Sequence, residues 1–265
     1  MTVWRVIKPE VNDAYTNMAI DEAIMKARIQ NIVPNTLRFY TWKPSAVSIG
    51  RFQTLADQIN IEKCRKDGVD IVRRISGGGA VYHDQNGEIT YSIITKLNDL
   101  GCTDLDILSA YQKICRGLNE AITILGTQAE YRPPNPKRCP NLAINGKKIS
   151  GNSQTSKKGI LQQHGTFLLD INHKKMFSYL RVPWAKTTND VLKVSKRRLT
   201  SAKQEFGKKI SVDEAYNSLV KGFKKALDIE FVEDALTKHE LKLAEKYRKE
   251  RFVIEDWTFL GKLTV

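Results

Sequence analysis

The chain has 265 residues, of which 41% are apolar and 27% are charged, and its formal net charge is +14. This length allows one large domain with a sizeable core, and no uninterrupted apolar run approaches the roughly 20 residues of a membrane span. A strongly basic chain favours acidic or polyanionic partners. Because the lysines of the C-terminal half lack interleaved aromatic residues, we expect solvated helix faces and an acidic protein partner rather than nucleic acid.

Residues 1–7 alternate like a strand and do not have the layout of a signal peptide, which predicts a cytoplasmic protein with no membrane partner. Four widely spaced cysteines form no Cys-x-x-Cys pair: Cys64, Cys102, Cys115 and Cys139. We therefore expect neither a disulfide framework nor a metal site built on cysteines.

The first half of the chain predicts helices that alternate with strands. Residues 17–28 place apolar side chains on one helical face, with Asn17 as the N-cap. Asp21 and Glu22 lie in the first turns of this helix, where acidic residues suit the helix dipole. Strands are predicted over 37–42, 46–50, 70–72 and 88–94, and a long amphipathic helix over 104–125.

The second half predicts a loop, a hairpin and two capped helices. Four prolines within 133–140 exclude regular structure and predict a surface loop over 131–140. Asn-Gly at 145–146 predicts a hairpin between strands at 142–144 and 148–150, and another strand follows at 160–169. Helices starting near Ser211 and Thr237 form a helical C-terminal part over about 211–257. This order indicates an α+β fold with mixed or antiparallel sheets packed against helices.

The segment 73–84, Arg-Arg-Ile-Ser-Gly-Gly-Gly-Ala-Val-Tyr-His-Asp, lies between two predicted strands. Three consecutive glycines would weaken a strand or helix, so they predict a loop. Such a loop lets a ligand lie against backbone N–H groups, while Arg73 and Arg74 supply charge and His83 a donor or acceptor. Its spacing is neither that of a Walker A loop nor that of a dinucleotide site, and a glycine triplet alone would more often be a hairpin turn.

Taken together, these twelve residues resemble the signature of the lipoate–protein ligase A family, which belongs with the biotin/lipoate ligase catalytic domains. The resemblance extends from about residue 17 to 257 and implies one catalytic domain of that fold over 1–265. In this segment it implies a site for substrate or adenylate, formed by Arg73, Arg74, Ser76, Gly77, Gly78, Gly79, Ala80, Val81, Tyr82 and His83.

A second motif lies at 145–154, Asn-Gly-Lys-Lys-Ile-Ser-Gly-Asn-Ser-Gln. A lysine just past a tight hairpin can be held over a pocket, where its ammonium suits a carboxylate or phosphate. Composition alone would favour two solvated lysines on a surface hairpin. The pattern Gly-x-Lys-x-x-Gly resembles the catalytic lysine element of the family, however, and implies that Lys148 is catalytic. Ser150, Gly151 and Ser153 would shape the wall beside it.

Other elements resemble the family less specifically. An Ile-Gly-x-x-Gln element and the strand over 158–166 imply further pocket residues, namely Gly50, Gln53, His164, Gly165 and Thr166. A turn glycine at Gly50 and a structural histidine at His164 remain open interpretations. Residues 179–200 are similar to the basic loop that folds over the adenylate in this family.

The resemblance implies two-step acyl activation and transfer. Lipoate or octanoate would react with ATP, with Mg²⁺ as cofactor, to form acyl-AMP. Lys148 would polarise the acyl carbonyl, and Arg73 and Arg74 would stabilise the phosphates. The acceptor would be one lysine on a lipoyl domain of a 2-oxoacid dehydrogenase or on an H-type protein. We recognise no accessory C-terminal domain in this sequence. We therefore expect the catalytic-domain-only form of the family, in which adenylate formation can need a separate small subunit.

Two alternatives stay open. A related group uses the same fold as a cysteine-dependent octanoyltransferase, which takes its acyl group from an acyl carrier protein without ATP. Gly79 favours the ligase, because the transferases usually have arginine there. Cys139 is the only cysteine near the right segment, although it lies several residues too close to 146–148, and it is the alternative nucleophile. The second alternative is a binding module that holds an acyl or nucleotide ligand without turnover.

Overall fold

The computed structural model describes residues 2–103, 106–135, 139–182, 185 and 187–263. Within these residues, the main sheet consists of β1 (Thr2–Asn12), β2 (Thr36–Trp42), β6 (Glu88–Lys96), β7 (Glu130–Arg132), β8 (Asn141–Ile144), β9 (Lys147–Lys157), β10 (Ile160–Leu168) and β11 (Ile229–Glu233). Its strand order is β11-β1-β2-β6-β10-β9-β8-β7. The pairs of β1 with β2 and β11 are parallel and the others are antiparallel, which confirms the predicted α+β fold with mixed sheets.

A smaller sheet lies beside it and supports residues 77–80, Gly-Gly-Gly-Ala, which are called the glycine-rich segment below. It consists of β3 (Ala46–Ile49), β4 (Asp70–Arg73) and β5 (Val81–His83), in the order β4-β3-β5. The strand β5 was not predicted. Residues 81–83 form it because their backbone pairs with β3 in a separate part of the chain, and local sequence does not reveal that pairing.

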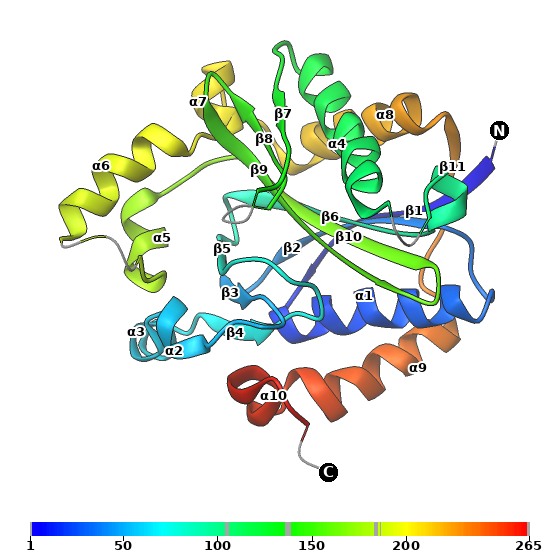
Figure 1. Cartoon of the computed structure of the whole chain (residues 1–265), viewed down its shortest axis with the longest axis horizontal. Helices are drawn as coiled ribbons and strands as arrows, with labels where there is room; N and C mark the ends of the chain where they lie inside the picture. Colours follow the sequence, from blue (N-terminus) through cyan, green and yellow to red (C-terminus); the bar gives the residue numbers. More distant parts are fainter. Residues whose placement is uncertain (1, 104–105, 136–138, 183–184, 186, 264–265) are drawn as a thin grey trace.

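Helices cover both faces of the main sheet (Figure 1). The described helices are α1 (Ala14–Ile29), α2 (Leu55–Gln58), α3 (Ile61–Lys66), η1 (Leu97–Leu100), α4 (Ile107–Ile124), α5 (His173–Tyr179), α6 (Thr188–Arg198), α7 (Ala202–Phe206), α8 (Val212–Leu227), α9 (Lys238–Tyr247), η2 (Arg248–Phe252) and α10 (Glu255–Leu260). In the part of the chain that the structure describes, no helix is long and apolar enough to cross a membrane.

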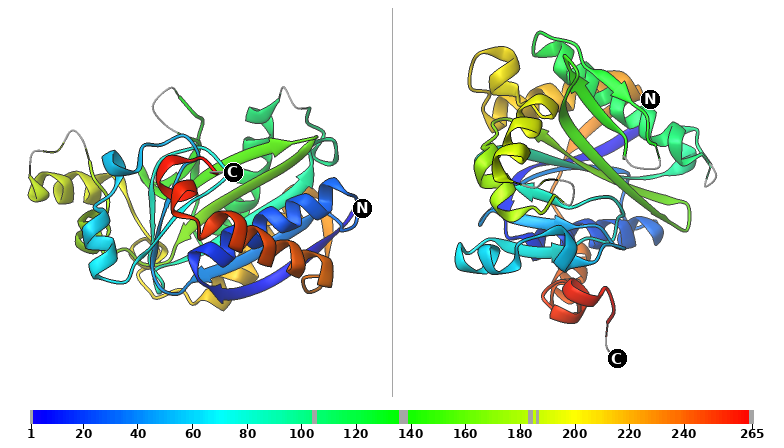
Figure 2. Two further views of the ribbon diagram at one scale, coloured as in Figure 1. Left: turned by 90° about the horizontal axis from the view of Figure 1, so that it is seen from below. Right: turned by 60° about the vertical axis from the view of Figure 1, so that its left-hand side comes forward.

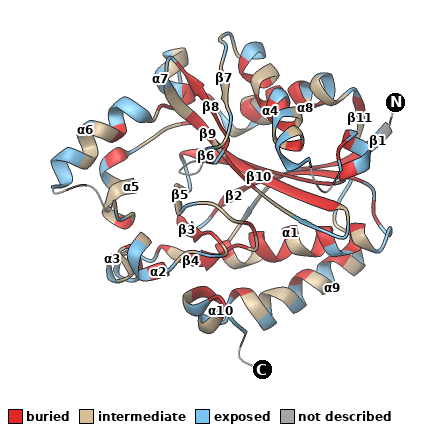
Figure 3. Cartoon of the chain, viewed as in Figure 1, coloured by how far each residue is buried: buried red, intermediate tan, exposed pale blue. Residues whose placement is uncertain are grey.

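Two apolar cores lie on opposite faces of the main sheet. Helices α4 and α8 pack on one face, and α1 with α9 on the other, as the left view of Figure 2 also shows. Side chains alternate along a strand, so Phe39 of β2 joins the first core and its neighbour Tyr40 the second. Both strand faces are therefore buried in the centre of the sheet (Figure 3).

The first helix begins earlier than predicted. Asp13 is the N-cap of α1, and its side chain accepts a hydrogen bond from the backbone N–H of Thr16 at 2.7 Å. Asn17 lies inside the helix and is buried, where its side chain donates to the carbonyl of Thr41 at 3.0 Å. The cap prediction at Asn17 was wrong because the tertiary contact with β2, and not the helix end, uses this amide.

The segment 179–200 differs from the predicted loop, because half of it forms helix α6. Thr187 caps this helix by accepting from the backbone N–H of Asp190 at 3.2 Å. The helix carries basic residues in its last turn and lies with α5 at one end of the molecule, on the left in Figure 1. Some predicted portions lie outside the described residues: residue 1 of the N-terminal strand, 104–105 of the long helix, 136–138 of the proline-rich loop, and 183, 184 and 186 of this segment.

Helices α4 and α8 approach each other closely at two glycines. A Cβ atom on Gly222 would lie 2.4 Å from the carbonyl oxygen of Gly117, and one on Gly117 would lie 2.2 Å from the Phe223 ring. We expect Gly222→Ala to lower the free energy of unfolding by about 1–3 kcal/mol, because the helices must separate. Urea unfolding measures this change. Lys221→Ala, on the exposed side of α8, is the control and should shift the free energy of unfolding by less than about 0.5 kcal/mol. Equal unfolding midpoints for the two variants would contradict the prediction.

Candidate active site

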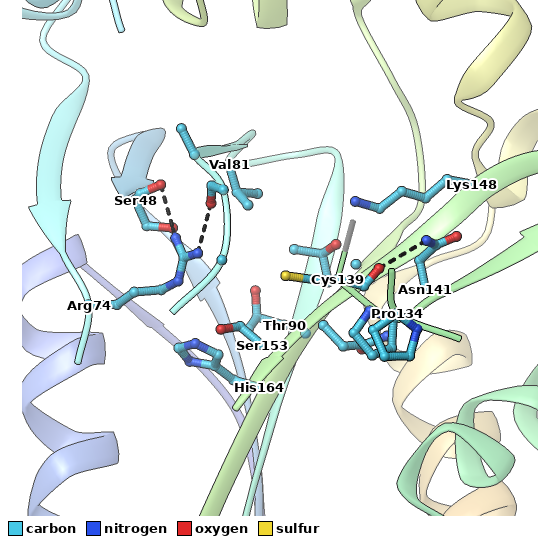
Figure 4. Close-up of a pocket in the computed structure, with 18 of the residues that line it drawn as sticks. Ser48, Arg74, Val81, Thr90, Pro134, Cys139, Asn141, Lys148, Ser153 and His164 are labelled. Atoms are coloured by element: carbon cyan, nitrogen blue, oxygen red, sulfur yellow. Dashed lines mark hydrogen bonds between the residues drawn. The ribbon is translucent and has the colours of Figure 1, made fainter. Parts of the chain in front are cut away.

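A cavity of about 1160 Å³ is lined by residues of both sheets, the glycine-rich segment and the end of α6 (Figure 4). The predicted site residues that line it are Gln53, Arg74, Gly78, Gly79, Ala80, Val81, His83, Cys139, Lys148, Gly151, Ser153, His164, Gly165 and Thr166. The predicted residues outside its lining are Gly50, Arg73, Ser76, Gly77, Tyr82 and Ser150. The fold therefore brings the glycine-rich segment and the lysine motif to one cavity.

Lys148 is held at the cavity wall by the hairpin that precedes it. Asn145 and Gly146 both have positive φ values, 48° and 77°, as a tight turn between β8 and β9 requires. A Cβ atom on Gly151 would lie 2.6 Å from Lys148 Nζ, so Gly151 provides the space for the ammonium. Burial lowers the pKa of Lys148, and the charge of Arg74 lowers it further, although Cys139 acts in the opposite direction.

The ammonium of Lys148 is available to a ligand. No hydrogen-bond acceptor or carboxylate contacts its Nζ within the ranges that the structure describes. The backbone carbonyl of Lys148 instead accepts from Thr200 N–H at 2.9 Å, which fixes the strand to the segment after α6. A positioned cation without an ionic partner can stabilise negative charge that develops on a carbonyl or phosphate oxygen.

Arg74 and Ser153 fix the orientation of two peptide groups in the glycine-rich segment. The carbonyl of Gly77 accepts from Arg74 at 2.8 Å and from Ser153 Oγ at 2.7 Å, and the carbonyl of Gly79 accepts from Arg74 at 2.7 Å. In a planar trans peptide the N–H points opposite to the C=O. The N–H groups of Gly78 and Ala80 thus turn away from Arg74, and no acceptor for them is found among the described residues. Unpaired N–H groups in a loop suit an anion.

Gly50 acts outside the cavity, as a spacer for this segment. A Cβ atom on Gly50 would lie 2.0 Å from the carbonyl oxygen of Gly78. Gln53 holds the same turn, because its Oε1 accepts from the N–H of Gly50 at 2.9 Å. Only glycine at position 50 lets the glycine-rich segment approach β3 so closely.

Arg73 does not match the prediction that it stabilises phosphates. Its guanidinium is buried and donates only to backbone carbonyls, those of residues 50, 51 and 53 on one side and 257–259 on the other. It does not line the cavity. Arg73 therefore joins the turn after β3 to α10, which the sequence did not indicate.

Arg74 lines the cavity, but its hydrogen bonds are also directed to the protein. It donates to the carbonyl and the hydroxyl of Ser48, both at 3.1 Å, in addition to the two glycine carbonyls. Burial lowers the pKa of Arg74 to about 10, so the side chain remains charged at neutral pH. Its charge acts on a ligand mainly through the peptides it orients.

Sequence reasoning missed a buried charged cluster behind His164. Asp21 bonds Arg38 at 2.9 Å and Tyr40 at 3.1 Å, and lies 3.5 Å from His164 Nδ1, while His164 Nε2 bonds Ser76 Oγ at 2.7 Å. Burial would raise the pKa of Asp21, but the hydrogen bond to His164 and the charge of Arg38 outweigh burial and lower it. Burial lowers the pKa of His164, which favours its neutral imidazole, although the nearby Asp21 acts in the opposite direction.

A sequence signal for this cluster was present. Asp21 follows Asn17 by four positions, on the same helical face as Ile24, and that face is apolar. Two polar residues on an apolar face indicate a buried polar network more strongly than they indicate an N-cap or an interaction with the helix dipole.

Cys139 lies in the same cavity as Lys148. It is an exposed free cysteine, and its Sγ would lie 3.4 Å from a Cβ atom on Gly78. The amide of Asn141 donates to the Cys139 carbonyl at 3.2 Å (Figure 4). The sulfur is therefore placed beside the glycine-rich segment, at a position that a covalent acyl intermediate could use.

A dedicated metal site is not formed by the described residues, in which no three His, Cys, Asp or Glu side chains gather. Mg²⁺ commonly binds through substrate phosphates and only one or two carboxylates. The predicted Mg²⁺ would therefore have to bind mainly through a nucleotide, and no step below depends on it.

Comparison with known proteins gives consistent matches over the whole chain. Residues 13–224 match the family described as "Lipoyl protein ligase A/B catalytic domain". Octanoyltransferase LipM from Brevibacillus brevis is 34% identical over 97% of this chain and 99% of the relative. Octanoyltransferase LipM from Clostridioides difficile is 36% identical over 95% and 98%.

Solved structures of similar fold bear ligase names. One, with 27% identity, a TM-score of 0.85 and complete coverage of both chains, comes from a study of a bi-partite lipoate protein ligase and its E2 lipoyl domain from Thermoplasma acidophilum. Another, a lipoate-protein ligase A bound with ATP, has 26% identity and a TM-score of 0.84, and the match covers 98% of this chain and 99% of the other.

The position of Arg73 leads to a test of its role. We expect Arg73→Met to lower the free energy of unfolding by roughly 3 kcal/mol, because buried carbonyls lose a charged donor. Hydrogen exchange should increase over 255–260 before the rest of the chain. The control is Arg65→Met, which removes an exposed ion pair with Glu255 at 3.2 Å and should cost about 1 kcal/mol or less. Unchanged exchange in α10 would show that Arg73 does not hold this helix.

Proposed function

This chain belongs to the lipoyl protein ligase A/B catalytic domain family, as an enzyme of lipoyl or octanoyl transfer, and we propose that it is an ATP-dependent lipoate–protein ligase. It would activate lipoate or octanoate to acyl-AMP and transfer the acyl group to one lysine of a lipoyl domain. The observation that carries the proposal is that the Lys148 ammonium, which has no ionic or hydrogen-bonding partner among the described residues, lines the same cavity as Gly78 and Ala80 of the glycine-rich segment.

The size of the cavity supports a nucleotide-bearing intermediate. Its volume of about 1160 Å³ exceeds the range of about 300–1,000 Å³ that is usual for small-molecule sites. Apolar walls from Met18 and Trp42 suit the acyl chain, and the polar wall at Lys148 suits the carboxylate and phosphate. An acyl chain alone would leave much of this space to water.

The chemistry follows from this placement. A carboxylate oxygen of the acid attacks the α-phosphorus of ATP and pyrophosphate leaves. The neutral amine of the acceptor lysine then attacks the acyl carbonyl, loses a proton, and AMP leaves. Lys148 would stabilise the charge on the carbonyl oxygen and on the leaving phosphate, and the N–H groups of Gly78 and Ala80 would bind the same anionic group. Binding and orientation of the two reactants supply the rest of the acceleration.

The proposed acceptor is acidic, since the chain has a net charge of +14. A lipoyl domain accompanies the ligase in the study of the Thermoplasma acidophilum relative, which is also named as bi-partite. We therefore include in the proposal a separate small subunit that adenylate formation can require.

The test follows the mass of an acceptor lipoyl domain and the release of AMP, with lipoate, ATP and Mg²⁺ present. We expect Lys148→Ala to reduce kcat by about 10²- to 10³-fold, the usual cost of removing one electrostatic stabiliser. Lys147→Ala is the matched control, because Lys147 directly precedes Lys148 on the strand and does not line the cavity. Equal rates in the two variants would contradict the role of Lys148. Absence of any ATP-dependent mass shift, with and without a candidate small subunit, would contradict the ligase proposal.

A second candidate function is favoured by Cys139 and by the names of the octanoyltransferase relatives. The thiolate of Cys139 would attack the thioester of an octanoyl-acyl carrier protein and release the carrier thiol. The amine of the acceptor lysine would then attack the new thioester, and Cys139 would leave as the thiolate. Lys148 would stabilise the carbonyl oxygen in both steps.

The two functions differ in their donor. With octanoyl-acyl carrier protein and no ATP, the octanoyltransferase requires an octanoyl mass shift on the acceptor that Cys139→Ser abolishes. For the ligase we expect Cys139→Ser to keep its ATP-dependent rate within about threefold, since a residue outside the reaction has a small effect. Cys115→Ser is not a suitable control, because Cys115 is buried in the core. The wild-type chain, measured with each donor, therefore provides the reference.

A further inference from the structure

A continuous chain of buried hydrogen bonds runs from β6 to the glycine-rich segment. Glu88 Oε1 accepts from His83 Nδ1 at 2.7 Å, and His83 Nε2 bonds Ser48 Oγ at 2.8 Å. Ser48 Oγ also accepts from Arg74 at 3.1 Å, and Arg74 holds the carbonyls of Gly77 and Gly79. The side chains that form this series of hydrogen bonds are all buried, with exposed fractions of 1% for Glu88, 2% for Ser48, and 4% for His83 and Arg74.

The surroundings of His83 fix its position. Its ring stacks on Trp42, with 3.9 Å between the centroids. Trp42 donates to Thr90 Oγ1 at 2.9 Å, and Thr90 in turn donates to Glu88 Oε1 at 2.8 Å. The imidazole is thus held from its face and from Nδ1, and its bond at Nε2 connects it through Ser48 to Arg74.

The donors and acceptors in this chain permit one arrangement of protons around neutral His83. A carboxylate only accepts, so the proton of the imidazole is on Nδ1 and Nε2 must accept. The hydroxyl of Ser48 must then donate to Nε2, which leaves its oxygen lone pairs for Arg74. Each hydrogen bond thereby determines which atom donates in the next one. The last two bonds, from Arg74, orient the carbonyls of Gly77 and Gly79.

We propose that Glu88, His83 and Ser48 are positioning residues that orient Arg74, and through it the N–H groups of Gly78 and Ala80 that receive the reacting anionic group. Glu88 and Ser48 were not recognised from the sequence. This inference rests on the proposed function for the identity of the reacting group. It does not depend on whether ATP or a thioester is the acyl donor, because both place a developing oxyanion in the cavity.

The proposal makes a specific kinetic prediction. Ser48→Ala removes the link between His83 and Arg74 with the loss of one hydroxyl. We expect kcat to fall by up to about 100-fold, since a misplacement of about 1 Å in groups that stabilise a transition state can cost that much. The KM of the acceptor domain should change less than kcat. Ser218→Ala is the matched control: Ser218 is also buried, bonds the carbonyl of Ala215 at 2.8 Å and lies on α8 outside the cavity.

A double-mutant cycle tests whether the residues act as one chain. Glu88→Leu alone should reduce kcat, and the combination with Ser48→Ala should reduce it little further, because one break already interrupts the chain. The proposal is overturned by a kcat for Ser48→Ala equal to that of Ser218→Ala, or by a double variant whose loss equals the product of the two single losses.

Nitrogen NMR of the imidazole gives a readout independent of activity. The resonances of His83 should report the proton on Nδ1 in the wild type and in Ser48→Ala, and a changed tautomer in Glu88→Leu. An Nε2–H tautomer in the wild type would overturn the positioning chain even in an active enzyme. An expected tautomer in a protein that is inactive with both donors would instead refute the proposed function and leave the positioning chain in place.

Discussion

The site depends on the hydrogen bonds that the buried guanidinium of Arg74 donates to the glycine-rich segment. Because it binds the carbonyl oxygens of Gly77 and Gly79, the peptides that contain these carbonyls must turn the N–H groups of Gly78 and Ala80 the other way. Gly78 accommodates this geometry with a φ of 90°, a conformation that side-chain-bearing residues rarely adopt. Of the three glycines, Gly78 is therefore the one that this geometry requires, whereas a Cβ atom on Gly77 or Gly79 would meet no atom within 4 Å.

Arg73 and Arg74 show how one strand end serves two purposes. Successive side chains of a strand point to opposite sides. Arg73 consequently donates to the carbonyls of α10, while Arg74 donates to those of the glycine-rich segment. Both are buried and neither faces a carboxylate among the described residues, so backbone carbonyls, and for Arg74 also the hydroxyl of Ser48, satisfy their donors. Lys148 is left as a cation of the cavity wall that is free to meet a substrate.

The sequence predicted those features whose causes are local. The Asn-Gly turn, the amphipathic pattern of α8 and the capping box at Thr237 depend on neighbouring residues, and the structure contains each of them. The position of Lys148 at the cavity follows from the same turn. The roles of Arg73 and Asn17 were misjudged because each is determined by a partner distant in the chain, α10 and β2 respectively. Glu88 looked like an ordinary strand residue for the same reason.

The acyl donor and the acyl acceptor make different demands on this cavity. Attack by an amine on a carbonyl needs a charge stabiliser and a leaving group, and the stabiliser is the same whether phosphate or sulfur leaves. Lys148 and the oriented peptides can thus serve either donor. The ligase would need space for a nucleotide, and the octanoyltransferase would use the sulfur of Cys139, which lies in the same cavity as Lys148. The two proposed functions would therefore differ in the donor side of the cavity and would share the groups that transfer the acyl group to lysine.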